Sequence, residues 1–246
     1  MQSKQKVDII PFNPTEVVDK IYTACRTCYM QGAPQEQYEK CGEISSDKKW
    51  KLIKHVIDSG HHSTLEHVSF TFLISGVSRA LSHQLVRHRI GVSYSQQSQR
   101  YCKFDKGFEY VTPPSIKKDG ITDAMYHDVM VSLNEAYKKL VDAGIPAEDA
   151  RMVLPNACCT NLTVTMNLRE LIHFCQERRC VCAQQEIRTL ANSMAKLIYT
   201  QIPNLKNHLG PKCHALNFCP EDEKRTCGRR PTKQNAFKEN YNLSID

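Results

Sequence analysis

Two stretches of the chain alternate apolar and polar residues, and each is followed at once by a segment with helical spacing. HVSFTFLIS (67–75) and residues 161–166 show the period-2 pattern of strands. RALSHQLVRHRI (79–90) and the long segment 167–201 show the 3.6-residue spacing of helices. A chain that must bury sheet faces and helix stripes together belongs to the α+β or α/β class.

The remaining segments add shorter elements. In chain order, the sequence predicts a strand at 6–10, a helix from Asn13 to about Tyr29, a polar loop at 30–46, a helix from Ser46 or Asp47 to about Ser59-Gly60, a helix at 123–143 and a helical segment from Ala147 to Pro155. Asn167, with Glu170 at the third helical position, predicts the N-cap of the last long helix. Residues 206–246 are basic and poor in apolar periodicity, so we interpret 1–205 as one domain and 206–246 as a Cys-containing appendage.

Composition narrows the class of protein. The N-terminal MQSKQKVDII lacks the apolar core of a signal peptide, and no apolar run approaches the roughly 18 residues of a membrane span. We therefore expect a cytoplasmic protein with no membrane partner. The net charge of +7 favours anionic partners such as nucleotides, folates or nucleic acid. The 12 cysteines are expected to be thiols or metal ligands before disulfides in a reducing compartment.

One stretch has a composition that a purely structural role explains poorly, namely RHRIGVSYSQQSQRY (87–101). Basic residues before Gly91 are ordinary at a helix C-terminus, because the free carbonyls there are negative. The donors that follow, Ser93 to Gln99, and the planar guanidinium of Arg100 favour instead a donor-rich loop at the helix end that binds an anion. His83 and Gln84 lie one turn before Arg87, so their side chains can meet it.

The same stretch resembles a family signature. RHR, the spacer IGVSYSQQ, Ser98 and the nearby Arg100 resemble the signature of the flavin-dependent thymidylate synthases (the ThyX family). The signature has a spacer of seven or eight residues, and the spacer here is the longer form. Three further segments resemble the family in the same order: GHHSTLEH (60–67), ARMVLP (150–155), and NLR (167–169) with His173, Arg178 and AQQEIR (183–188). The resemblance covers about residues 7–205, and the chain is identified as a member.

The resemblance implies a fold, a reaction and an assembly. The fold is α+β, with a central mixed or antiparallel sheet and long helices, in a homotetramer whose active sites lie between subunits. The reaction is the methylation of dUMP to dTMP, with methylenetetrahydrofolate as carbon donor, NADPH as reductant and FAD as hydride carrier. The family is not thought to use an enzyme nucleophile, so the cysteines are not nucleophile candidates.

The resemblance also assigns residues to FAD. They are His61, Ser63, Arg87, His88, Arg89, Gln96, Asn167, Leu168, Arg169 and His173. Arg169 and His173 are four apart and share a helix face. An ordinary helix position explains His173 equally well, because the family often has Asn there.

A second set of residues is implied for dUMP. It contains Gln84, Leu85, Val86, Arg87, Gln96, Gln97, Ser98, Gln99, Arg100, Arg151 and Arg178. Arg178 is the expected catalytic residue, since a fixed cation beside uracil N3 stabilises the anion and makes the ring carbon more nucleophilic. It follows Arg169 by nine residues and so faces the opposite side of the helix. Alternatively, Arg151 is a surface residue at a helix end and Arg178 pairs with a neighbouring Glu.

Two positions depart from the family pattern. Gln96 stands where some members have Glu, so a contact there is neutral. Gln185 stands where an aromatic residue is common, which affects packing more than chemistry.

The cysteines leave two hypotheses open. Cys180, Cys213, Cys219 and Cys227 have the ligand types for a structural zinc, as do three of them with His214. The spacing is not that of a tight CxxC pair, so free thiols remain the alternative. Cys25 and Cys28 form a CxxC inside a helical pattern, where a buried face explains them as well.

Two other functions compete with the enzyme. A basic nucleic-acid-binding module would place aromatics among basic residues along an exposed face. The signature stretch has mostly Gln and Ser, so we expect no nucleic-acid partner. A different flavoprotein on the same scaffold is the second alternative.

Overall fold

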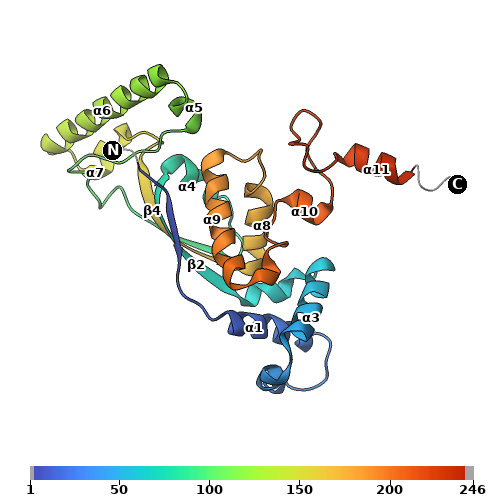
Figure 1. Ribbon diagram of the computed structural model, residues 1–246. Coiled ribbons are helices and arrows are strands. Elements are labelled where there is room, and N and C mark those ends of the chain that lie inside the picture. Colours follow the sequence, from blue (N-terminus) through green and yellow to red (C-terminus); the bar gives the residue numbers. More distant parts are fainter. Residues whose placement is uncertain (1–2, 242–246) are drawn as a thin grey trace. The chain divides into compact units, whose positions relative to one another are not determined.

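The computed structural model describes residues 3–241 (Figure 1). Residues 1–2 and 242–246, at the outer ends of the predicted domain and appendage, lie outside the described residues. Four strands form one sheet in the order β1-β2-β4-β3. Their bounds are Lys6–Ile9 for β1, Ser69–Ser78 for β2, Val92–Gln96 for β3 and Cys159–Asn167 for β4. The predicted strands at 6–10, 67–75 and 161–166 are confirmed.

The sheet is antiparallel. The Gln97 amide donates to the Asn161 carbonyl over 2.9 Å, and the Asn167 amide donates to the Gly91 carbonyl over 2.8 Å. Residue numbers thus rise along β3 as they fall along β4. β2 and β4 are related in the same way, since the hydroxyls of Thr71 and Thr165 lie 2.9 Å apart and Gly76 donates to the side chain of Asn161. The α+β prediction is confirmed.

The chain divides into two compact units. The first contains Met1–Asp8, Phe72–Arg89 and Ser93–Val164. Its helical segments are α4 (Arg79–Leu85), α5 (Pro114–Lys117), α6 (Gly120–Asp142), α7 (Ala147–Ala150) and the 3-10 turn η3 (Arg151–Val153). The Asp119 side chain caps α6 by accepting from the amides of Ile121 and Thr122. The buried face of α6 packs through Met130 against Phe108, Tyr110 and Cys158.

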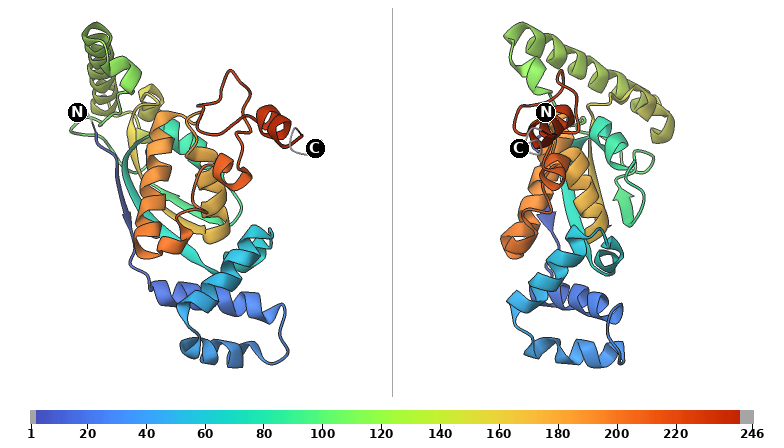
Figure 2. Two further views of the ribbon diagram at one scale, coloured as in Figure 1. Left: turned by 45° about the vertical axis from the view of Figure 1, so that its right-hand side comes forward. Right: turned by 90° about the vertical axis from the view of Figure 1, so that its right-hand side faces the viewer.

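The second unit contains Ile9–Thr71, Ile90–Val92 and Thr165–Asp246. Its helices are α1 (Pro14–Thr27), α2 (Pro34–Glu39), α3 (Ser46–Asp58), α8 (Leu168–Arg178), α9 (Gln185–Gln201), α10 (Lys212–Leu216) and α11 (Lys233–Tyr241). The 3-10 turns are η1 (Lys40–Glu43), η2 (His62–His67) and η4 (Pro203–Leu205). α1 lies beside α3 and α8 beside α9 (Figure 2).

The start of α1 and its contact with α3 follow from a few polar residues. The Asn13 side chain accepts from the amides of Thr15 and Glu16, which confirms the predicted helix start. Lys49 of α3 is buried and its ammonium lies 2.5 Å from the carboxylate of Asp19 on α1. A buried cation without such a partner would be costly, so the pair fixes how the two helices meet.

Three predictions about local structure are wrong. The long helix 167–201 is two helices, because residues 179–184 form a turn in which Ala183 donates back to Cys180 and the Gln184 side chain caps α9. The polar stretch 30–46 contains α2 and η1. Helix α4 ends at Leu85, so the RHR triplet follows the helix, and the predicted apolar position Val86 is 39% exposed.

A further difference concerns the donor-rich stretch. Residues 92–96 form strand β3, which the sequence suggested was a loop. Two exposed serines alternate with half-buried residues along it, and this polar edge lacks the apolar alternation that marks a strand. Among the described residues, no helix is long and apolar enough to cross a membrane.

Candidate active site

The RHR turn is held by a tyrosine from the next strand. The Tyr94 hydroxyl lies 2.7 Å from the Leu85 carbonyl and 2.8 Å from the His88 carbonyl. His88 is buried, whereas the neighbouring Arg87 and Arg89 are exposed. Among the described residues, neither guanidinium forms an ion pair. The turn therefore presents two free cations on a fixed backbone.

The amide side chains after the turn are held against β4. The Gln96 amide donates to the Thr160 hydroxyl over 3.2 Å, and the Gln97 carbonyl accepts from Asn161 over 2.9 Å. Gln99 donates to the Cys158 sulfur. Pairing with a strand orders these polar side chains before a ligand binds. Ligand binding therefore costs less side-chain entropy than it would with mobile side chains.

Gln96 and Gln97 also line a hollow of about 500 Å³ in the first unit. The side chains around it are mainly polar and include Lys6, Asp8 and Asn161. Ser98 and Arg100 do not line it. Ser98 instead accepts a hydrogen bond from the Arg100 amide over 3.2 Å, which shapes the turn that follows.

Arg100 and Arg151 meet at a single glutamate. The Arg100 guanidinium lies 2.8 Å from the carboxylate of Glu148, and the Arg151 guanidinium donates to the Glu148 backbone carbonyl over 3.0 Å. Arg151 lies in η3, directly after α7, as the predicted helical segment before Pro155 implied. The structure thus brings together two residues that the resemblance assigned to dUMP. Both guanidiniums keep further N–H groups for an anion.

A third arginine joins this group and was missed by the sequence reasoning. Burial lowers the pKa of Arg79, the nearby Cys158 thiol opposes that shift, and the positive charge of Arg151 lowers it further. Arg79 stands in the first turn of α4, where a cation opposes the helix dipole. That misplaced charge is the signal that could have identified it.

In the second unit, Asn167 has a structural role. Its side chain accepts from the Glu170 amide over 2.8 Å, which confirms the predicted N-cap of α8. The backbone of Gly91 passes so close that a β-carbon there would lie 2.1 Å from the Asn167 amide. The neighbouring Leu168 is fully buried and donates its amide to Val68. Both residues therefore hold the start of α8 in place.

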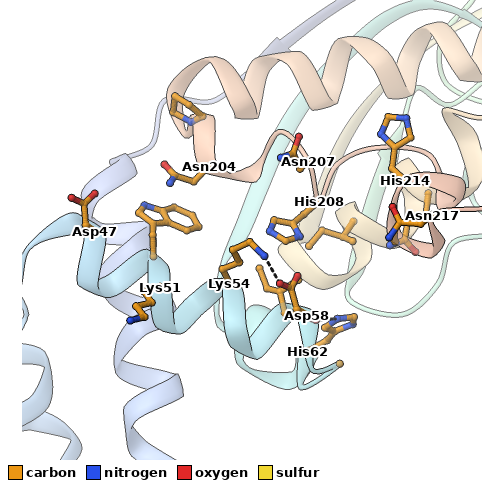
Figure 3. Close-up of a pocket in the computed structure, with 17 residues that line it drawn as sticks. Asp47, Lys51, Lys54, Asp58, His62, Asn204, Asn207, His208, His214 and Asn217 are labelled. Atoms are coloured by element: carbon orange, nitrogen blue, oxygen red, sulfur yellow. Dashed lines mark hydrogen bonds and ion pairs between the residues drawn. The ribbon is translucent and has the colours of Figure 1, made fainter.

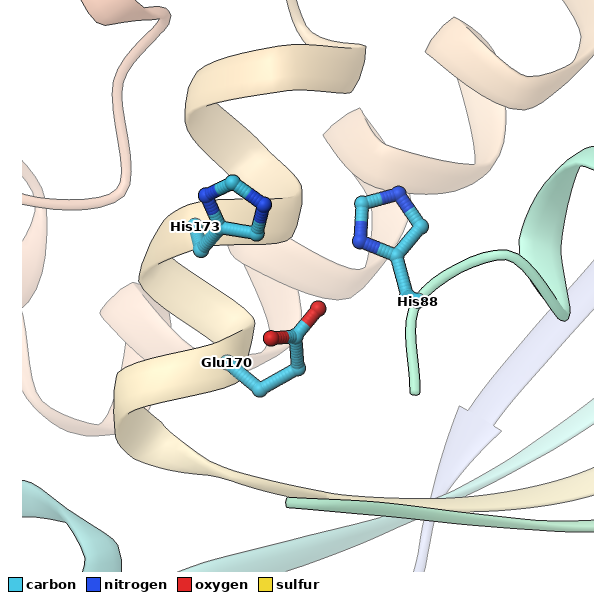
Figure 4. A group of neighbouring side chains, drawn as sticks. All are labelled: His88, Glu170 and His173. Atoms are coloured by element: carbon cyan, nitrogen blue, oxygen red, sulfur yellow. The ribbon is translucent and has the colours of Figure 1, made fainter. Parts of the chain in front are cut away.

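Arg169 and His173 emerge from α8 near this start. Arg169 forms an exposed ion pair of 2.5 Å with Glu66 of η2. His173 is exposed and follows the buried Glu170 by three residues, so the two side chains project to the same side of α8 (Figure 4). Polar groups of both signs thus line one face of this helix.

His61 and Ser63 lie at the start of η2. The His61 ring lies 3.2 Å from the Tyr29 hydroxyl, and Gly60 before it has φ of 77°, which ends α3 sharply. Ser63 is exposed. The residue between them, His62, bonds the Ile57 carbonyl and lines a large pocket of this unit.

That pocket has a volume of about 910 Å³ and is rich in basic groups (Figure 3). Lys54 and Asp58 of α3 form an ion pair on its wall. Burial lowers the pKa of His208. The negative charge of Asp58 opposes this shift, and the positive charges of Lys54 and His62 add to it. Burial also lowers the pKa of His214, helped by Arg230, Arg179 and Arg229. The positive surroundings suit an anionic ligand, but the residues predicted for FAD and dUMP do not line this pocket.

Arg178 is half-buried in the last turn of α8 and lines a small pocket beside the following turn.

Burial raises the pKa of Cys158 to about 11 and that of Cys175 to about 12, against the opposing charges of Arg79 and Arg179. Both thiols are therefore protonated and poor nucleophiles at neutral pH.

Comparison with known proteins identifies the family of the chain. The family model for "Thymidylate synthase complementing protein" matches residues 13–204. The flavin-dependent thymidylate synthase of Nitratidesulfovibrio vulgaris is 44% identical over 243 residues, which cover 95% of this chain and 98% of the relative. That of Geobacter sulfurreducens is 46% identical over 217 residues, covering 88% and 91%. This chain belongs to the flavin-dependent thymidylate synthase family.

A solved structure agrees on the fold. The UMP/dUMP methylase PolB from Streptomyces cacaoi, bound with 5-Br dUMP, superimposes with a TM-score of 0.70 at 22% identity, covering 84% of this chain and 95% of that one. As a flavin-dependent thymidylate synthase, the chain methylates dUMP to dTMP (EC 2.1.1.148) with FAD as cofactor and methylenetetrahydrofolate and NADPH as co-substrates. The family assignment replaces the alternative of a nucleic-acid-binding module.

Proposed function

We propose that the residues of the signature stretch divide the work of this reaction as the resemblance implied. Arg87, His88 and Arg89 bind FAD. The residues for dUMP are Arg87, Gln97, Ser98, Gln99, Arg100 and Arg151. The observation that carries the proposal is the meeting of Arg100 and Arg151 at Glu148. Two guanidiniums that both bond Glu148 suit the dianion of a nucleotide phosphate, which accepts several charge-assisted hydrogen bonds.

The residues present fit FAD. The cofactor carries a pyrophosphate, and the exposed guanidiniums of Arg87 and Arg89 are suitable partners for it. The resemblance also assigns His61, Ser63, Arg169 and His173 to FAD. Bound FAD supplies the hydride chemistry.

Arg178 acts on the uracil in this proposal. A guanidinium beside N3 stabilises the ring anion and directs electron density to the carbon that is methylated. The half-buried position of Arg178 strengthens this effect, because electrostatic attraction is larger away from bulk water. Gln84, Leu85, Val86 and Gln96 complete the expected nucleotide site.

The working assembly in this proposal is a homotetramer with active sites between subunits. Ile121, Met125 and Val129 of α6 are 73%, 63% and 53% exposed and are spaced four residues apart. They form an apolar stripe along one helix face, which a second copy of the chain would cover. Tyr101 and Met152, both 81% exposed, lie next to Arg100 and Arg151. A neighbouring subunit would bury them and enclose the nucleotide.

The domain interpretation also belongs to the proposal. Residues 1–205 form the catalytic domain, supported by a family model that ends at 204, and 206–246 form an appendage. The enzyme works in the cytoplasm, where its substrates are made.

Tritium release from dUMP labelled at uracil C5 tests the proposed function. We expect release to require FAD, NADPH and methylenetetrahydrofolate together. Arg100→Gln and Arg151→Gln should each raise KM for dUMP with flavin content unchanged. Undiminished dTMP formation by flavin-stripped protein would contradict the requirement for FAD, and full flavin content in Arg87→Gln and Arg89→Gln would contradict the assignment of these residues to FAD.

A further inference from the structure

Three side chains of metal-ligating type converge in the structure. They are His88, Glu170 and His173, and one ligand atom from each lies within 4.8 Å of the other two. Figure 4 shows the two imidazole rings and the carboxylate turned toward one another. Among the described residues, no other set of three or more histidine, cysteine or carboxylate groups comes together in this way.

The cysteines predicted as zinc ligands do not form such a set. Cys180, Cys213, Cys219 and Cys227 line one small pocket of about 200 Å³ in the second unit. In the part of the chain that the structure describes, no three of their sulfur atoms lie together at the distance that joins the group above. His214, the alternative ligand, lines the basic pocket instead. The zinc hypothesis for these cysteines therefore gains no support.

Helix α8 supplies two of the three converging groups from its first turns. Glu170 and His173 are three residues apart, so their side chains project to the same side of the helix. The Asn167 side chain caps α8 at the Glu170 amide over 2.8 Å, which fixes the helix start on which both side chains stand. A Glu-x-x-His pair on one helix face is a recurrent way of placing a carboxylate and an imidazole on the same metal centre.

The backbone of His88, which carries the third group, is held on both sides. Its amide donates to the Leu85 carbonyl over 3.1 Å, and its carbonyl accepts from the Tyr94 hydroxyl over 2.8 Å. The side chain is 6% exposed, whereas Arg87 and Arg89 on either side of it are exposed. A buried imidazole on a fixed turn is a ligand positioned in advance, and the flanking guanidiniums point to a different task.

The burial of the carboxylate favours a cation as its partner. Glu170 is 8% exposed, and a buried carboxylate is costly unless positive charge or several donors compensate it. Neutral imidazoles supply hydrogen bonds, whereas a divalent ion supplies charge as well. Each of the three side chains already takes part in at least one interaction. An imidazole has two ring nitrogens and a carboxylate two oxygens, so each group can bind an ion and keep a second partner.

We propose that His88, Glu170 and His173 bind one divalent transition-metal ion, for which Zn²⁺ serves as the probe. Two imidazole nitrogens and one carboxylate oxygen are the ligand set of mononuclear zinc and non-haem iron sites. Any proton on a ligating nitrogen passes to solvent as the metal binds. The ion occupies one nitrogen of each ring, so it does not exclude the FAD contacts proposed for the two histidines. Its role is to fix the three side chains, and it takes no part in the methylation.

Zinc content of the flavoprotein tests the proposal. The protein is freed of metal with a chelator and dialysed against Zn²⁺ alone, and bound zinc is measured by mass spectrometry. Because thiols also bind zinc, the decisive quantity is the difference from wild type, and Glu170→Gln should bind about one equivalent less. Glu177→Gln removes an exposed carboxylate two turns later on the same helix and should bind as much zinc as wild type. Equal zinc in Glu170→Gln and wild type, or equal losses in both variants, would overturn the proposal.

A second measurement needs no variant and so does not depend on how a variant folds. X-ray absorption is recorded at the zinc edge of the wild-type flavoprotein loaded with an equimolar amount of Zn²⁺. We expect only nitrogen and oxygen neighbours around the metal, at about 2.0–2.2 Å. Sulfur neighbours at about 2.3 Å would assign the ion to cysteines and refute the site. Neither measurement reports flavin content or turnover, so a failure here would leave the residues proposed for FAD and dUMP untouched.

Discussion

The side-chain amide of Asn167 fills the space where Gly91 lacks a β-carbon. A β-carbon at Gly91 would lie 2.1 Å from the Asn167 nitrogen, and Gly91 has φ of 69°. The same Asn167 side chain caps α8. One contact therefore fixes both the turn after RHR and the start of the helix that carries Arg169 and Arg178.

Gly91→Ala should destabilise the protein by about 2–3 kcal/mol. The left-handed conformation costs about 1–2 kcal/mol for a residue with a β-carbon, and displacing Asn167 adds a lost cap of about 1 kcal/mol. Gly144→Ala is the matched control, since Gly144 has φ of 85° with nothing within 4 Å of its missing β-carbon. Chemical denaturation checks both variants. An equal cost at the two sites would show that the Asn167 contact contributes nothing.

Glu148→Gln should alter nucleotide binding more than stability. The Arg100–Glu148 pair is about half exposed on both sides, and such pairs contribute at most about 1 kcal/mol. Without the carboxylate, Arg100 no longer has a competing anion, so we expect KM for dUMP to fall about two- to fivefold at low salt and to converge with wild type at high salt. Asp149→Asn makes a similar charge change one residue away and should have a smaller effect. Identical KM values for both variants would argue against Arg100 as a phosphate ligand.

Arg178→Lys keeps the positive charge and removes the planar fork. If the guanidinium acts on uracil, turnover should fall about 10- to 100-fold while the FAD content of the purified protein stays at one per chain. Absorbance of the flavin and the tritium-release rate measure the two quantities. Arg229→Lys, on the exposed C-terminal segment, should change neither. Parallel loss of flavin and turnover in Arg178→Lys would indicate a role in folding instead.

Because of two histidines in the basic pocket, we expect the protein to become less stable as the pH falls. Burial lowers the pKa of His208 and of His214, so the unfolded chain binds more protons than the folded one just below the ordinary histidine pKa. Stability is therefore complete above about pH 6.5 and decreases as the pH falls below it. His208→Asn should flatten this part of the melting-temperature profile, whereas the exposed His67→Asn should leave it unchanged. A wild-type melting temperature that rises below pH 6.5 would contradict the argument.

Met125→Lys should dissociate the proposed homotetramer. If the apolar stripe on α6 is a subunit interface, a cation in its middle would have to be buried there without a partner. Light scattering should report a smaller particle than for wild type, and the helix content should not change. Ala124→Lys introduces the same charge one position earlier on the exposed surface and serves as control. An unchanged particle size for Met125→Lys would exclude the stripe as an interface.

The sequence predicted elements where the physical signal is local. Asn13 and Asn167 cap the helices they were expected to cap, because an N-cap needs only a short polar side chain and nearby amides. The break at 179–184 has no Gly or Pro to mark it. It depends on Arg179, which bonds Asn192 over 2.8 Å and also the carbonyl of Leu209, thirty residues away in the chain. Such tertiary contacts leave no periodic pattern.

The candidate site was predicted by resemblance more than by pattern. The signature stretch named Arg100 and Arg151, but only the structure shows that Glu148 joins them. Arg79 was missed because it is marked by the electrostatic influence of Arg151, which lies far from it in the sequence.

Strand β3 lies inside the spacer of the signature, and this limits how the spacer can change length. Tyr94 and Gln96 reach their partners because they alternate with Ser93 and Ser95 along a strand paired with β4. Deleting one residue within 92–96 would shift the register by one and turn every side chain to the opposite face. A seven-residue spacer must therefore lose its residue at the Ile90–Gly91 turn, outside the paired strand, and engineered chimaeras between the two spacer lengths should be joined there.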